Sequence, residues 1–94
     1  MKIVVNKCYG GFSLNQKFLD HVEKLHPNYF EIEPDERVNP FIIEELEKYP
    51  EDASGDCASV CIVEIPDEAT DYYIQDYDGY EDVLYVLDGK IHFA

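Results

Sequence analysis

Hydrophobic and polar residues repeat with a helical period in the first half of this chain and with a strand period in the second. One helical face is formed by four apolar residues at spacings of four, four and three: Leu14, Phe18, Val22 and Leu25. Ser13 is predicted to be the helix N-cap, and Gln16 three positions later is predicted to complete a capping box. The pattern therefore predicts a first helix that follows Ser13 and ends at Pro27.

A second helix is predicted to begin at Asn39, with Asn as the cap and Pro40 in the first turn. Its apolar face consists of Ile42, Leu46 and Tyr49, and Pro50 stops it. Between the two helices, residues 29–33 alternate weakly between apolar and polar side chains. We interpret this segment as a short strand.

Strands are predicted at both ends of the chain. The β-branched run Ile3–Val5 indicates a buried first strand that ends near Cys8. Four strands follow the second helix, at residues 59–65, 72–75, 82–87 and 91–93. Asp88-Gly89 is a hairpin turn, because both central positions of a type I′ turn need positive φ, and Asp78-Gly79 is a further turn. These elements predict a single α+β domain over residues 1–94, in which two short helices pack on a mainly antiparallel sheet with a C-terminal meander.

The charge of the chain limits its partners. Twenty-one Asp and Glu face seven Lys and Arg, which gives a formal net charge of −14. Direct binding to nucleic acid or to an anionic membrane is disfavoured, because phosphate binding needs clustered cations. The negative charge favours a cation or a basic protein surface as the partner. Alternatively, the charge serves only to keep the chain soluble. Three cysteines, no secretory signal and no membrane span lead us to expect a cytoplasmic protein with reduced thiols.

Acidic residues and tyrosines are concentrated in the stretch between Lys48 and Lys90, which contains no Lys or Arg. It holds twelve acids, namely Glu51, Asp52, Asp56, Glu64, Asp67, Glu68, Asp71, Asp76, Asp78, Glu81, Asp82 and Asp88, with five tyrosines among them. Unpaired carboxylates are too costly to bury, so most of these acids are expected at the surface. The combination of negative charges and flat rings is typical of a nucleic-acid mimic. The alternative is a solvated sheet face whose tyrosines pack on the core side.

The mimic hypothesis assigns the partner-binding site to eight residues. They are Asp67, Asp71, Asp76, Asp78, Glu81 and Asp82 as contact charges, with Tyr77 and Tyr80 as flat anchors. The partner would be a basic host protein, such as a nuclease or another nucleic-acid-binding protein. A homodimer is a further alternative, because the C-terminal strand leaves a sheet edge that a second copy could pair with.

Other kinds of site receive less support from the sequence. Gly10-Gly11 lies between a strand and a helix N-terminus, so Gly10, Gly11 and Ser13 form an alternative nucleotide or signal-molecule site. The segment 76–82 lacks the spacing of a calcium loop, and Cys57 and Cys61 lack the spacing of a zinc site. Neither a nucleophile elbow nor a zinc-protease motif is present. We therefore expect no enzyme, no cofactor and no metal.

Two blocks of the chain resemble a family of short, largely uncharacterised phage and prophage proteins. The first block is MKIVVNKCYGGFSL at the start, and the second comprises residues 65–68 followed by YDGYE at residues 77–81. Together they cover about a third of the chain. The resemblance implies no catalytic residues. It implies a phage setting, the cytoplasm of a bacterial host and an anti-defence role, such as that of an anti-CRISPR inhibitor.

Overall fold

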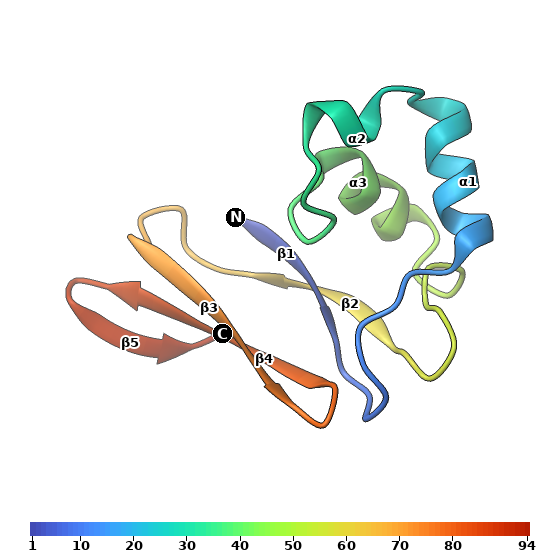
Figure 1. Cartoon of the computed structure of the whole chain (residues 1–94). Coiled ribbons are helices and arrows are strands. Elements are labelled where there is room, and N and C mark those ends of the chain that lie inside the picture. The colour runs from blue at the N-terminus through green and yellow to red at the C-terminus, as the bar shows by residue number, and fades with distance from the viewer.

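The computed structural model describes all residues of the chain, 1–94, and contains three helices and five strands (Figure 1). In chain order these are β1 (Lys2–Asn6), α1 (Gln16–Leu25), α2 (Tyr29–Ile32), α3 (Pro40–Lys48), β2 (Val60–Glu64), β3 (Asp71–Tyr77), β4 (Tyr80–Leu87) and β5 (Lys90–Phe93). The α+β class is confirmed. None of the helices has the length and apolarity needed to cross a membrane.

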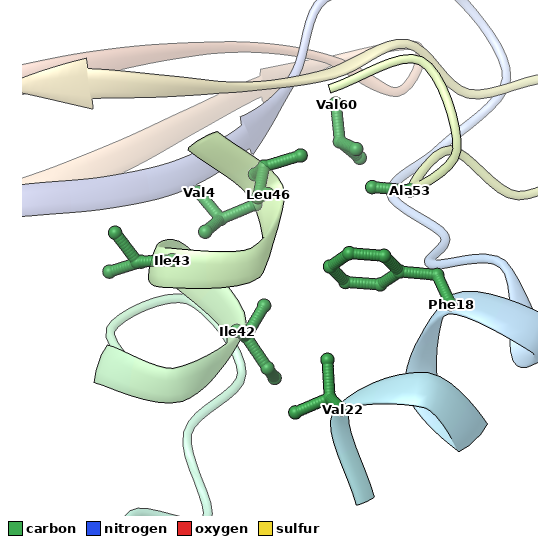
Figure 2. Packing of buried hydrophobic residues seen from close by; sticks show 8 residues of the cluster. All are labelled: Val4, Phe18, Val22, Ile42, Ile43, Leu46, Ala53 and Val60. Carbon is green, nitrogen blue, oxygen red and sulfur yellow. The ribbon is translucent and has the colours of Figure 1, made fainter. Parts of the chain in front are cut away.

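The strands form two antiparallel sheets, β1-β2 and β3-β4-β5, rather than one. The helices cover one face of β1-β2 and the three-stranded sheet lies against the other (Figure 1). Val4 of β1 packs in the helical cluster, which Figure 2 shows, whereas its neighbours Ile3 and Val5 pack against Val83 of β4. Because successive side chains of a strand point to opposite faces, β1 is buried on both. This explains its unbroken β-branched run.

The C-terminal meander has the predicted order and turns. Tyr72 pairs with Tyr85 and Ile74 with Val83, and these four residues line the inner face of the sheet, toward β1. Both central residues of each hairpin turn have positive φ: Asp78 (50°) and Gly79 (90°) in one, Asp88 (53°) and Gly89 (74°) in the other. The hairpin prediction at Asp88-Gly89 is confirmed.

The start of the first helix was predicted wrongly. Asn15, not Ser13, is its N-cap, and the Asn15 side chain accepts a hydrogen bond from Lys17 N. Ser13 instead belongs to a loop, where its carbonyl accepts a hydrogen bond from Gly55 N. Phe18 and Val22 are buried as expected, but Leu25 and Tyr49, at the ends of their helices, are about half exposed.

The segment 29–33 is also corrected, because residues 29–32 form the one-turn helix α2 and no strand. The reason is a tertiary contact. Asn39 caps α3 through its side-chain oxygen, and its amide nitrogen donates to the carbonyls of Tyr29 and Glu33 at 3.0 and 2.7 Å. The buried Asn39 side chain thus fixes both ends of this short segment. The helix that was predicted to begin at Asn39 is α3, and Asn39 is its N-cap as expected.

Candidate functional site

Five of the eight predicted partner-binding residues come together at one end of the β3–β4 hairpin. We call the group Asp76, Tyr77, Asp78, Tyr80 and Asp82, together with Tyr9, the hairpin tip. The local sequence builds its turn, because Asp and Gly tolerate positive φ and the Asp76 carboxylate accepts a hydrogen bond from Gly79 N at 2.7 Å. Asp76 and Asp78 are exposed.

Three aromatic rings gather at the hairpin tip. The Tyr9 ring lies 5.3 Å from that of Tyr80 and 6.4 Å from that of Tyr77, measured between centroids. Tyr77 is 71% exposed and Tyr9 66%. Sequence reasoning missed Tyr9, since it lies far along the chain from the hairpin and no local pattern brings it there. The tip thus presents the exposed rings of Tyr9 and Tyr77 beside carboxylates, with the half-buried Tyr80 ring packed against Tyr9.

Lys7 is the cation of this region. Its ammonium forms an ion pair with Asp82 at 2.9 Å and lies 5.1 Å from the centroid of the Tyr80 ring. Asp82 is therefore partly neutralised, and the carboxylates of the tip without an ion pair are Asp76 and Asp78. A partner would meet those two charges first.

The prediction that Glu81 is an exposed contact charge is corrected by the structure. Its side chain is only 3% exposed and forms a two-pronged ion pair with Arg37, at 2.5 and 2.6 Å. It also accepts a hydrogen bond from Asn6 N at 2.8 Å. Burial alone would raise the pKa of Glu81, but the hydrogen bonds from Arg37 and Asn6 outweigh it, and the pKa is lowered. Glu81 is an ionised structural residue and cannot reach a partner.

Arg37 and Asn6, which bind Glu81, also make contacts with other parts of the chain. Arg37 also donates to the Val4 carbonyl at 3.1 Å, and its guanidinium stacks 3.5 Å above the Phe12 ring. The Asn6 side chain donates to the Cys8 and Gly79 carbonyls and accepts from Ser59 N. The network therefore joins the helical half, β1 and the hairpin, and it holds the hairpin tip in place.

Asp67 and Asp71 lie apart from the hairpin tip. Asp71 begins β3, five residues before Asp76, which corresponds to roughly 17 Å along the strand. Its carboxylate accepts hydrogen bonds from Tyr72 N and from the Tyr73 hydroxyl. Asp67 pairs with the amino group of Met1 at 2.6 Å, which lowers its pKa. The structure thus divides the eight predicted residues into five at the tip, two at the far end and one buried.

The geometry expected for a nucleotide at Gly10, Gly11 and Ser13 is not present. The α1 helix begins five residues after Gly11, and its first backbone groups are capped by Asn15. A Cβ on Gly79 would lie 2.1 Å from Gly11 N, and one on Gly10 would lie 2.3 Å from the Cys57 carbonyl oxygen. Gly10 and Gly79 thus allow three loops to pack backbone against backbone, whereas a Cβ on Gly11 would meet open space.

A second polar group joins α1 and α3. Buried Glu45 contacts His21 Nε2 at 3.0 Å and Lys48 Nζ at 3.3 Å. Burial would raise the pKa of Glu45, but its hydrogen bonds with His21 and Lys48 lower it. Side-chain ligand atoms of His26, Glu44 and Glu45 lie within 4.8 Å of one another, yet Lys48 also contacts both carboxylates. A metal ion would have to displace that ammonium.

His21 also lines an open hollow of about 430 Å³ beside Tyr49 and Ser54. The Ser54 hydroxyl accepts a hydrogen bond from Val60 N and makes none with His21, so no activated nucleophile is formed there.

The three cysteines are free thiols, with Cys57 exposed and Cys61 half-buried. Burial raises the pKa of Cys61, which makes its thiol less reactive. The hollow beside His21 and the three cysteines therefore give less support for a catalytic site than the hairpin tip gives for a binding site.

Comparison of the chain with protein-family models, with curated proteins and with solved structures finds no match. The geometry of the chain itself therefore carries the functional argument.

Proposed function

We propose that this is a small acidic phage-type protein that inhibits a host defence protein or another nucleic-acid-binding protein by occupying its basic binding surface. The observation that carries the proposal is the hairpin tip, where the two unneutralised carboxylates Asp76 and Asp78 lie at the turn and the rings of Tyr9, Tyr77 and Tyr80 gather beside them. Carboxylates spaced along a turn present charge as phosphates do, and the exposed rings offer stacking surfaces in place of bases.

The charge of the whole chain supports this choice of partner. A net charge of −14 attracts a basic groove over several ångströms and accelerates association in a salt-dependent way. The tip is also held in advance by the buried Arg37–Glu81 pair, so little ordering is needed when a partner binds.

The first experiment identifies the partner and then measures inhibition. The tagged chain is incubated with bacterial lysate at low and at high salt, and the bound proteins are identified by mass spectrometry. The purified partner is then titrated with the chain while its binding to nucleic acid is followed. We expect complete inhibition near one chain per binding site and a weaker effect as salt rises. A chain that leaves the nucleic-acid binding of every captured protein unchanged would refute the proposal.

A charge-removing variant tests the hairpin tip directly. Asp76→Asn keeps the acceptor for Gly79 N, and Asp78→Asn tolerates the positive φ, so the double variant keeps the turn. We expect its affinity for the partner to fall about tenfold at low salt, and less at high salt. The matched control is Glu51→Gln/Asp52→Asn, which removes two exposed charges from a loop outside the tip. Equal losses in both variants would show that only net charge matters.

A further inference from the structure

The outer face of the three-stranded sheet, away from β1, carries a continuous group of apolar side chains. In the strand register, Leu84 of β4 lies between Tyr73 of β3 and Phe93 of β5, and Val86 pairs with Ile91 in the next row. Side chains of one row and of alternate rows share a face. We call these five residues, Tyr73, Leu84, Val86, Ile91 and Phe93, the outer apolar patch.

Three residues of the outer apolar patch are largely exposed, and Leu84 and Val86 between them are half-buried. Ile91 is 66% exposed and Phe93 70%, and more than half of Tyr73 is exposed as well. None of the five residues belongs to or packs against either hydrophobic cluster. Side chains of these types with such exposure present on the order of 400 Å² of apolar surface, a size that in a monomer often marks a binding site.

The charges around the outer apolar patch select the kind of partner. Asp71 lies in the same row as Val86 and Ile91, and Asp88 is in the β4–β5 turn. Asp82 lies one row beyond Leu84 and is paired with Lys7, so Asp71 and Asp88 are the rim acids without an ion pair. None of the strand positions on this face is Lys or Arg. The patch is therefore an apolar centre with an acidic rim.

We propose that the outer apolar patch anchors the chain on a partner protein whose surface has an apolar centre and a basic rim. This rests on the proposed function, because it describes the same partner and adds a contact that a nucleic acid does not make. A patch of this size fills only about half of the ~800 Å² that each side of a standard interface buries, so the rim must contribute. A second copy of the chain would place acidic rims against each other, whereas a basic rim would pair with them.

Binding is then divided between two regions. The hairpin tip adjoins the outer apolar patch on the same sheet, since Tyr77 and Tyr80 pair with each other two rows from Tyr73 and Leu84. The charges of the tip speed up association, and the apolar side chains slow down dissociation once water has been excluded. Variants of the two regions should therefore change different rate constants.

The test uses two synthetic peptides of equal charge as probes, one of four Leu-Lys repeats and one of four Ser-Lys repeats, and titrates each against the chain by calorimetry. The Ile91→Thr/Phe93→Thr variant removes exposed apolar side chains and places β-branched Thr, which favours strands, at both positions. Its matched control is Phe30→Thr/Ile32→Thr on α2, where the two side chains are 55% and 63% exposed. Thermal unfolding of every variant verifies that it is folded.

We expect the chain to bind the Leu-Lys peptide more tightly than the Ser-Lys peptide. In Ile91→Thr/Phe93→Thr the affinity for the Leu-Lys peptide should fall about tenfold, with little change for the Ser-Lys peptide and no loss in the α2 control. Equal binding of the two peptides, or equal loss in both variants, would overturn the inference. So would a dimer of the unmodified chain in analytical ultracentrifugation that becomes monomeric in Ile91→Thr/Phe93→Thr. The assay uses no host protein, so its failure is distinct from a failure to find an inhibited target.

Discussion

The two faces of β4 use neighbouring carboxylates in opposite ways. Glu81 points to the inner face, where it is buried and bound by Arg37 and Asn6. Asp82, the next residue, points to the outer face, where its side chain is half exposed and pairs with Lys7. The first carboxylate holds the hairpin against β1, and the second belongs to the hairpin tip. The comparison shows that two acids one position apart on β4 meet different surroundings, because successive side chains of a strand point to opposite faces.

The largest expected effect comes from removing the inner carboxylate. Glu81→Ala leaves the half-buried Arg37 guanidinium without its counter-charge and Asn6 N without its acceptor, which costs about 3 kcal/mol of unfolding free energy, the low end for a buried pair. Urea unfolding followed by circular dichroism measures the change. A loss below about 1 kcal/mol would mean that the ion pair contributes little and that the two faces do not differ as described.

The next effect concerns the turn that joins β3 to β4, just before Glu81 and Asp82. Gly79→Ala combines a positive φ of 90° with a Cβ 2.1 Å from Gly11 N, and we expect a loss of about 2–3 kcal/mol. Gly89→Ala is the matched control, because its φ is 74° but no atom lies within 4 Å of the added Cβ. It should cost about 1 kcal/mol, the backbone contribution alone. Equal losses at the two glycines would show that the loop contact is unimportant.

A smaller effect is the pH dependence of the inner pair. The folded chain holds the pKa of Glu81 below its ordinary value of 4.5, so the stability that the ionised group contributes is fully present above pH 4.5 and is lost as pH falls through the lowered pKa. Glu81→Gln does not titrate at this position. The difference in unfolding free energy between the unmodified chain and Glu81→Gln should therefore shrink below pH 4.5. A difference that is constant from pH 7 to pH 3 would contradict the assignment.

The smallest effect is expected on the outer face. Asp82→Asn breaks only a partly exposed pair with Lys7, so the unfolding free energy should change by no more than about 0.5 kcal/mol. The same urea titration that measures Glu81→Ala measures this variant, and the ratio of the two losses quantifies how the faces differ. A cost above about 2 kcal/mol would make Asp82 a structural residue like Glu81.

Local chemistry allowed much of the fold to be predicted. The Asn39-Pro40 start of α3, the β-branched β1 and the Asp-Gly turns were all predicted from residues adjacent in the chain. Each depends on backbone preferences or capping bonds that act over a few positions. The start of α1 was predicted wrongly because Ser13 and Asn15 are both good cap residues, and the contact of Ser13 with Gly55 decided between them.

The candidate site could be predicted only in part. Tyr77 and Tyr80 were predicted as flat anchors within an acidic turn, and the structure places their rings together with that of Tyr9. The same acidic pattern placed Glu81 at the surface, because its partner Arg37 lies 44 positions away and a single sequence does not reveal that pairing.

The sequence by itself therefore determined the class of the fold, its turns and the excess of negative charge, since these depend on composition and on neighbours in the chain. The tertiary structure alone decided which charges remain free, which loops pack on Gly79 and which sheet face stays uncovered. Those outcomes depend on contacts between distant segments, as at Arg37–Glu81 and Gly79–Gly11. Such contacts form only when burial repays the loss of chain entropy, and no local pattern records where that happens.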